Sequence, residues 1–373
     1  MVVERLLELV KDLVMRPTPP SATGVHVREA LEWIYRAQDT GKDRGVSHSY
    51  VLDRGWMPSY PETTGYIIPT LLNLADLLDE PEPRRRALEM AAWEIEVQLP
   101  QGAIPSLATG DPVVFDTGQV IFGWVAAFEA FGEQRFLDAA LRAGDWLISA
   151  MDKDGCWRQW MASTTGLTYN ARTAWALAEL GRVAEIDRFE EAARYFINWS
   201  LTQEHRDGWF SYNCLDDNTR PLLHTIAYTA RGQLEAGVLL DEPRFIEAAE
   251  RTARALCGCV GDRGRMAGRF TQTWDPAVRW VCLTGVAQTS VLWSRLARVT
   301  GDGSYRDAAT RALEFLKSTH DVASRRDELR GGIRGSYPVS GAYCRYRLPN
   351  WATKFFLDAL LHAEGALIPR FKG

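Results

Sequence analysis

Two acidic residues, Glu62 and Asp116, each begin a long segment that is rich in alanine, glycine and aromatic residues. Cleavage of a glycosidic bond needs an acid that protonates the leaving oxygen and, in most cases, a second carboxylate that acts as base or nucleophile. The two carboxyl groups then lie about 5–9.5 Å apart. Helices that are neighbours in space could hold two such residues within this range. We therefore expect Glu62 and Asp116 to form a catalytic pair.

A second set of residues suits proton abstraction instead. His224 and Tyr228 are one helical turn apart and share a face, and Asn170 and Arg172 begin the preceding segment of the same kind. Removal of the proton next to a uronate carboxylate requires a base at C5 and groups that neutralise the carboxylate. Lyases built as helical toroids use Asn, His, Arg and Tyr for this step. His224 and Tyr228 are therefore the alternative catalytic candidates.

The expected substrate is an anionic, uronate-containing oligo- or polysaccharide. The chain has 14 tryptophans, and aromatic side chains over a cleft can contact the apolar faces of sugar rings. The two long segments 260–283 and 321–349 carry ten arginines and five acidic residues in a chain of net charge −5, and arginine is suited to bidentate recognition of carboxylate or sulfate. The residues that we expect to bind substrate are Tyr60, Tyr66, Gln119, Asn170, Arg172, Trp209, Gln288, Arg334, Tyr337, Arg345, Asn350, Trp351 and Lys354.

A purely structural role competes with the catalytic one for the residues at helix starts. Asp116 and Gln119 have the spacing of a capping box. The two interpretations of Asp116 predict opposite changes in its pKa. Burial and a nearby carboxylate would raise the pKa of a general acid, whereas backbone N–H groups and the helix dipole would lower the pKa of a cap.

The elements that must position these residues are two kinds of helix that alternate along the chain. Amphipathic segments with one apolar stripe recur six times, and between them lie apolar segments with few charges, as in helices buried on most sides. The amphipathic segments are 27–39, 82–99, 135–151, 188–203, 244–259 and 305–320. The apolar segments begin at Glu62, Asp116, Asn170, His224, Thr284 and Asn350.

Six helical hairpins of ~54–66 residues predict an all-α fold, an (α/α)6 toroid of six inner and six outer helices. Strand signals are nearly absent. Residues 1–20 are expected to form a lead-in helix and linker, and residues 21–373 a single barrel domain. The connections that lead into the inner helices are long, and loops beyond ~12–15 residues are uncommon unless functional. The site is therefore expected where the inner helices begin.

Composition excludes several classes of protein. No apolar run approaches the ~18 residues of a membrane span, and an acidic chain is a poor partner for nucleic acid. The N-terminus alternates charged and apolar residues, unlike a signal peptide, so a cytoplasmic location is expected. The six cysteines form no C-x-x-C pair, and we predict neither a metal nor a cofactor. The oligomeric state is left open.

The pattern resembles the six-hairpin glycosidase superfamily, which includes unsaturated glucuronyl and rhamnogalacturonyl hydrolases. The resemblance implies an (α/α)6 barrel and an aspartate at the start of an inner helix as general acid, which matches Asp116. The second acid of those hydrolases is also an aspartate, whereas this chain has Glu62. The stretches SYPETTGY, GGIRGSYP and LPNWATKFF are also similar to uncharacterised proteins associated with polysaccharide biosynthesis.

A further resemblance, through YFINWSLTQEHRDGWF, is to terpenoid-cyclase-like toroids, whose acidic motif is represented here only by Asp216-Asp217. The sequence thus leaves four functions open. A glycoside hydrolase that uses the two carboxylates comes first, and a polysaccharide lyase or uronate C5-epimerase that uses His224 and Tyr228 comes second. A non-catalytic glycan-binding protein and a cyclase-like enzyme are the others.

Overall fold

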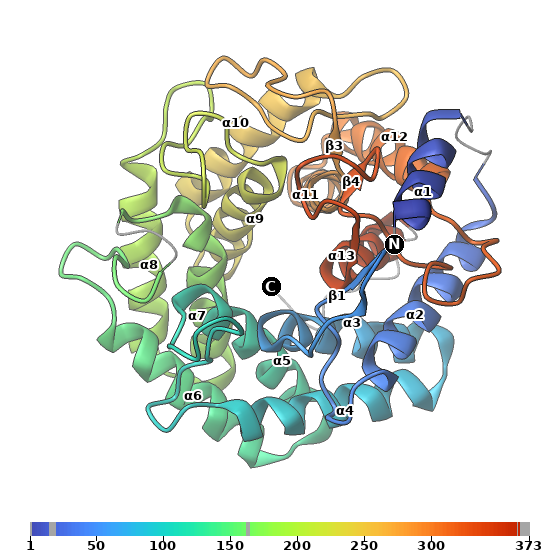
Figure 1. Ribbon diagram of the computed structural model, residues 1–373. Coiled ribbons are helices and arrows are strands. Elements are labelled where there is room, and N and C mark those ends of the chain that lie inside the picture. Colours follow the sequence, from blue (N-terminus) through green and yellow to red (C-terminus); the bar gives the residue numbers. More distant parts are fainter. Residues whose placement is uncertain (1, 15–19, 162–164, 364, 366–373) are drawn as a thin grey trace.

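Twelve helices form two concentric rings (Figure 1). The computed structural model describes residues 2–14, 20–161, 165–363 and 365. The inner helices are α3 (Pro61–Leu78), α5 (Val114–Phe131), α7 (Ala171–Ala184), α9 (Leu223–Leu239), α11 (Leu283–Thr300) and α13 (Asn350–Ala363). The outer helices are α2 (Thr23–Asp39), α4 (Pro81–Val97), α6 (Gln134–Ser149), α8 (Asp187–Leu201), α10 (Pro243–Cys259) and α12 (Gly303–Thr319).

The inner ring is closed. Each inner helix packs against the next one in chain order, and α13 packs against α3. Each outer helix packs against the inner helix of its own hairpin, with α2 against α13. The predicted all-α (α/α)6 toroid is therefore confirmed, and every inner helix begins within two residues of its expected start. The repeat was detectable because a helix buried on most sides cannot carry the charges of an outer helix.

The inner helices approach one another closely at glycines. A Cβ atom at Gly123 would lie 2.4 Å from the carbonyl oxygen of Gly65, and one at Gly232 would lie 2.2 Å from the carbonyl carbon of Ala171. Only glycine permits such contacts between backbones. These contacts fix the spacing of α3, α5, α7 and α9, and with it the positions of the residues at their starts.

Replacement of Gly232 by alanine is expected to lower the free energy of unfolding by about 1–3 kcal/mol, because α9 must shift away from the backbone of α7. Gly258→Ala in the outer helix α10 is the matched control, since no atom lies within 4 Å of its added methyl group. The control should be neutral or slightly stabilising. Urea unfolding of both variants measures the difference, and equal stabilities would contradict the close-packing argument.

Short strands join the long loops at the end where the inner helices begin. β1 (Ser49–Val51) lies between β2 (Gly55–Trp56) and β5 (Arg347–Pro349), with Tyr50 opposite Leu348. β3 (Val281–Cys282) pairs with β4 (Ser336–Tyr337). The strands span two or three residues, which is why sequence periodicity did not reveal them. The pairing of β1 with β5 links the first long loop to the last one at this end of the barrel.

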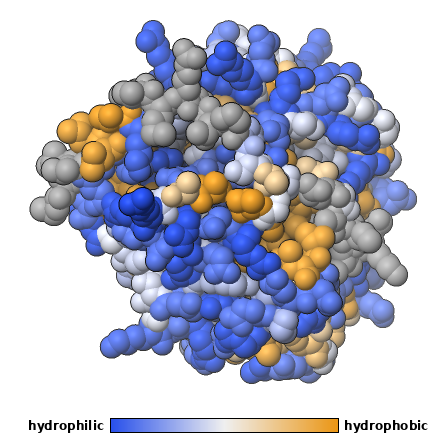
Figure 2. Space-filling view, turned by 90° about the vertical axis from the view of Figure 1, so that its right-hand side faces the viewer, coloured by the Kyte–Doolittle hydropathy of each residue, from blue (hydrophilic) through white to orange (hydrophobic). Residues whose placement is uncertain are grey.

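The first helix, α1 (Val2–Val14), lies against the barrel beside α12 and β4 (Figure 1). Residues 2–14 are helical, whereas the expected linker up to residue 20 falls mostly on residues 15–19, which lie outside the described part of the chain. Leu6, Leu7 and Val10 of α1 are exposed. Figure 2 shows this side of the molecule, where hydrophobic residues form separate patches within a hydrophilic surface. None of the described helices is long and apolar enough to cross a membrane.

Candidate active site

A cavity of about 730 Å³ opens where the inner helices begin, as the loop lengths predicted. It is large enough for a sugar with its neighbouring residue. Seven of the predicted residues line it, namely Glu62, Asp116, His224, Tyr228, Tyr60, Tyr66 and Trp351. The wall also contains residues that sequence reasoning did not select, including His48, Asp111, Phe115, Trp160, Tyr169 and Tyr343.

The two predicted acids share one phenol. The Tyr60 hydroxyl lies in very short hydrogen-bond contact with Glu62 Oε2 and 3.4 Å from Asp116 Oδ2. Two hydrogen bonds to one oxygen place the two carboxylate oxygens within roughly 6 Å of each other. This separation lies at the short end of the range that glycosidic cleavage uses. The structure therefore brings together the pair that the sequence suggested.

Burial gives both acids an elevated pKa. The pKa of Asp116 is well above its usual value because the carboxyl group is buried and because Glu62 opposes a second negative charge. Burial raises the pKa of Glu62 to about 7, while the bond from Tyr60 and the charge of Arg172 act in the opposite direction. Glu62 can therefore gain or lose its proton near neutral pH, and the upward shift in the pKa of Asp116 favours its protonated form. One member of the pair can therefore donate a proton while the other accepts one.

Asp116 is not the N-cap of its helix. The N-cap of α5 is Val113, and Asp116 is the third residue of the helix, where the bond from its own backbone N–H lowers its pKa less than burial and Glu62 raise it. An N-capping carboxylate would have a lowered pKa, because it would accept bonds from free backbone N–H groups. The raised pKa and the position in the cavity wall are those expected of an acid–base group.

Two neutral histidines lie in the same wall. His224 Nδ1 is 3.0 Å from Gln288 Oε1, and an amide oxygen can only accept, so Nδ1 carries the hydrogen and Nε2 keeps a lone pair. His48 Nδ1 contacts the Ser49 hydroxyl at 2.9 Å. Burial lowers the pKa of each histidine to about 4, so both are uncharged near pH 7. Either could act as a base.

Aromatic side chains make up much of the remaining wall. Trp351 Nε1 donates to the Tyr343 hydroxyl at 2.8 Å, and the Tyr343 ring lies 5.3 Å from that of His224. The ring of Trp351 meets His48 edge to face at 4.8 Å. These rings present flat apolar surfaces with their polar atoms already bonded, which suits contact with a sugar ring.

Several predicted residues support the wall from behind. Gln288 holds His224, and Gln119 Oε1 accepts a hydrogen bond from Arg172 Nε at 2.6 Å. Asn350 donates to the Ser47 carbonyl at 2.9 Å and to the Thr63 hydroxyl at 2.8 Å. These contacts join the first long loop to the starts of α13 and α3. These residues therefore position the site and do not line it.

The other predicted binding residues also lie away from this cavity. Asn170 is buried and donates to the Leu167 carbonyl, and Trp209 packs edge to face on Trp274. Arg345 lies over the Tyr346 ring. Arg172 and Lys354 line a separate cavity further along the barrel. Composition could not distinguish these positions, because buried and ligand-facing polar residues look alike in sequence.

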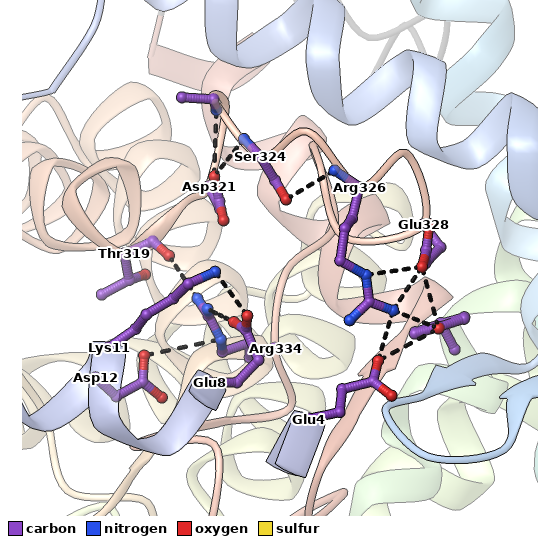
Figure 3. Close-up of polar contacts among 12 residues, drawn as sticks. Glu4, Glu8, Lys11, Asp12, Thr319, Asp321, Ser324, Arg326, Glu328 and Arg334 are labelled. Carbon is purple, nitrogen blue, oxygen red and sulfur yellow. Dashed lines mark hydrogen bonds and ion pairs between the residues drawn. The ribbon is translucent and has the colours of Figure 1, made fainter. Parts of the chain in front are cut away.

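Arg334 and Tyr337 bind the N-terminal helix. Arg334 Nη2 is 2.6 Å from Glu8 Oε2, and its Nε is 3.8 Å from Asp12 (Figure 3). The Tyr337 hydroxyl donates to the backbone carbonyl of Asp12 at 3.1 Å. Arg326 in turn pairs with Glu4 at 2.6 Å. Part of the arginine excess in the last long loop therefore meets the acidic face of α1, which the sequence analysis had not paired with it.

Replacement of Arg334 by alanine is expected to release α1, because Glu8 and Asp12 would lose their ion pairs to the barrel, and Glu8 would keep only Lys11 of its own helix. A helix of 13 residues is marginal by itself, so trypsin should cleave after Lys11 at least ~10-fold faster. Arg330→Ala is the control from the same loop, since Arg330 pairs with Glu29 and Asp327. Equal cleavage rates in the two variants would contradict this role, and substrate affinity should be unchanged in both.

Most residues that sequence reasoning missed come from the long loops or their ends. Trp160 and Tyr343 belong to loops whose aromatic content was evident, but nothing in the sequence showed which rings face inward. His48 comes from the first long loop and reaches the wall because β1 pairs with β5. Among the described residues, no group of three His, Cys, Asp or Glu is placed to hold a metal ion.

No protein-family model matches the chain, and no curated protein matches it either. Solved structures match it in fold. An unsaturated glucuronyl hydrolase from Bacillus sp. GL1 is 16% identical, with a TM-score of 0.74 over 92% of this chain and 97% of that one. A D-mannose isomerase is 11% identical, with a TM-score of 0.72 over 92% and 97% of the two chains.

A cellobiose 2-epimerase from Bacillus thermoamylovorans is 11% identical, with a TM-score of 0.69 over 96% of this chain and 99% of that one. The resemblance to unsaturated glucuronyl hydrolases and their superfamily is thus confirmed at the level of the fold. The match covers nearly the whole length of each chain, so the barrel with its loops is the unit that these proteins share.

Proposed function

We propose that this protein is a carbohydrate-active enzyme, most specifically a glycoside hydrolase that cleaves an oligosaccharide bound in the 730 Å³ cavity. The observation that carries the proposal is the acid pair. Asp116 and Glu62 meet at one phenol inside an aromatic cavity, and their pKa values are both raised. The fold is one on which sugar hydrolases, epimerases and isomerases occur.

In this mechanism, Asp116 is the general acid. Its buried carboxyl group keeps a proton at neutral pH and gives it to the leaving oxygen as the glycosidic bond breaks. Glu62 is the second carboxylate, which activates water or stabilises the developing positive charge of the sugar ring. Tyr60 bridges the two acids and can stabilise whichever of them is ionised.

The wall favours a sugar that is uncharged at the reacting position. No lysine or arginine is among the described residues that line the cavity, whereas Glu62, Asp111 and Asp116 are. The arginines that suggested a uronate do not line this cavity. Arg334, for example, forms an ion pair with Glu8 of α1. We therefore propose that hydroxyl and ring contacts bind the reacting sugar, and that uronates are accepted only where their carboxylate points out of the cavity.

An epimerase or isomerase is the second candidate, because the wall holds His48 and His224, both neutral near pH 7. A neutral imidazole beside a sugar carbon can remove a proton, and a second one can return it. The lyase or C5-epimerase predicted from His224 and Tyr228 belongs to the same class of chemistry.

One experiment distinguishes these functions. The protein is incubated with neutral and uronate-containing oligosaccharides in deuterated water, and the products are read as new reducing ends, unsaturated uronate absorbance and deuterium incorporation. New reducing ends from neutral substrates support the hydrolase. Deuterium in an uncleaved sugar supports the epimerase, and unsaturated ends support the lyase. Binding without turnover on every sugar would contradict an enzymatic function.

A further inference from the structure

A second cavity, of about 100 Å³, lies further along the barrel than the proposed active site. Part of its wall comes from the later halves of the inner helices, with Asn73 of α3, Glu179 of α7, Glu235 of α9, Arg295 of α11 and His362 of α13. Tyr66 belongs to the walls of both cavities. This space is large enough for several water molecules or a small ion. We call it the lower cavity.

Each carboxylate in the wall of the lower cavity is already paired. The pairs are Glu235 with Arg231 at 2.5 Å and Arg295 at 2.7 Å, Asp358 with Lys354 at 2.5 Å, and Glu179 with Arg182 at 3.0 Å. Arg231, Arg295 and Lys354, the other arginine and lysine side chains in the wall, are therefore already paired with these carboxylates. None of them forms an ion pair with the one remaining arginine in the wall, Arg172.

Arg172 is buried, with 5% of its surface exposed. Its Nε donates to Gln119, and its guanidinium carbon lies 5.1–5.7 Å from the centres of five aromatic rings. Neither of its terminal nitrogens has a hydrogen-bond acceptor among the described residues. A guanidinium group has five N–H donors, and the terminal nitrogens of Arg172 are not among the fully buried atoms without a partner, so they reach the open space of the cavity that the residue lines. These donors therefore face a space that can hold an acceptor.

We propose that the lower cavity binds a small oxyanion, a carboxylate or a phosphate-type ion, whose oxygens accept hydrogen bonds from the terminal nitrogens of Arg172. A planar guanidinium fits two oxygens of such an ion at once. His362 also lines this cavity. The surrounding carboxylates are each neutralised, so they do not repel the ion strongly.

The bound ion would also act on the proposed active site, a consequence that rests on the proposed function. The positive charge of Arg172 holds the pKa of Glu62 below the value that burial alone would give. An anion beside Arg172 offsets that charge, so the pKa of Glu62 should rise when the ion binds. The acid limb of the pH–activity profile should then move to higher pH. Binding itself is measurable whether or not the protein has hydrolase activity.

The test is isothermal titration of the full chain with sodium phosphate and, separately, sodium acetate, in HEPES at constant ionic strength. We expect saturable 1:1 binding of at least one of the two ions with a Kd of ~1 mM or tighter, as two charge-assisted hydrogen bonds would give. Arg172→Gln should weaken binding at least ~10-fold. Arg188→Gln is the matched control, because it removes an exposed arginine that pairs with Asp145, neither of which lines the cavity, and its Kd should stay within ~3-fold.

A crystallographic measurement keeps the proposal testable if Arg172→Gln does not fold. Crystals of the unmodified protein are soaked in sodium bromide, and anomalous scattering locates the halide, which takes the same kind of site. A bromide peak beside the Arg172 guanidinium supports the site. Bromide confined to the molecular surface, an absence of saturable binding for both oxyanions, or equal affinities of the wild type and Arg172→Gln would each overturn it.

Discussion

Asp116→Asn is expected to lower turnover at least ~100-fold, the lower scale of general acid catalysis, while the protein remains folded. Asparagine has nearly the same shape as protonated aspartic acid, and the raised pKa of Asp116 favours that neutral form in the native protein. The substitution therefore changes little in the packing of α5. It removes only the proton that the leaving oxygen needs.

The pH profile gives an independent check. The wild type requires an ionised Glu62 and a protonated Asp116, so activity should rise through pH ~7 and fall again where Asp116 loses its proton. The alkaline limb should be absent from the residual activity of Asp116→Asn. Glu94→Gln is the control, since Glu94 is also a buried acid but does not line the cavity. Unchanged turnover in Asp116→Asn would leave His224 and Tyr228 as the leading catalytic residues.

The sequence predicted the fold closely because the repeat is a physical necessity of the barrel. Inner helices such as α5 must be nearly free of charge, and outer helices such as α6 must have one apolar face, so the alternation is visible in the residues themselves. The position of the site followed from the lengths of the loops. Glu62, Asp116 and His224 could be selected because they are polar residues at the starts of otherwise apolar helices.

The sequence could not show which polar residues reach the cavity. Asn350 and Gln288 stand at the same kind of position as Glu62, yet their side chains bond to neighbouring elements behind the wall. The direction of a side chain at a helix start depends on how the helix is rotated against its neighbours, and that is set by contacts such as Gly65 with Gly123.

The sequence also could not show which charged residues form ion pairs within the protein. Arg334 was assigned to a substrate because its partners Glu8 and Asp12 lie more than 300 residues away in sequence.

A buried acid outside the cavity leads to a prediction about stability. Glu94 of α4 is completely buried, and neither of its carboxylate oxygens has a hydrogen-bond partner. Burial raises its pKa well above the ordinary value of 4.5, and a charge on Asp116 would oppose its ionisation further. Burial therefore favours the protonated form of Glu94 in the folded protein, whereas the residue ionises at its ordinary pKa in the unfolded chain.

The sign of the effect follows from proton linkage. Above pH 4.5 the folded state binds one more proton at Glu94 than the unfolded state, so the contribution of this residue to stability is present at low pH and is lost as pH rises. The loss is about 1.4 kcal/mol per pH unit until the pKa of the folded state is reached. Asp116 behaves in the same way, and the two residues together make the fold less stable in alkaline solution.

Glu94→Gln is accordingly expected to raise the free energy of unfolding at pH 7, by about 1.4 kcal/mol for each pH unit between 4.5 and the pKa of the folded state, and to change it little at pH 4. Glutamine keeps the shape of the side chain and needs no proton to be neutral. Glu96→Gln is the matched control from the same helix, since Glu96 is exposed and paired with Arg44. Urea unfolding of the three proteins between pH 4 and pH 8 measures the slopes. A stability gain that does not depend on pH, or a gain of equal size in Glu96→Gln, would show that Glu94 is not held protonated by its burial.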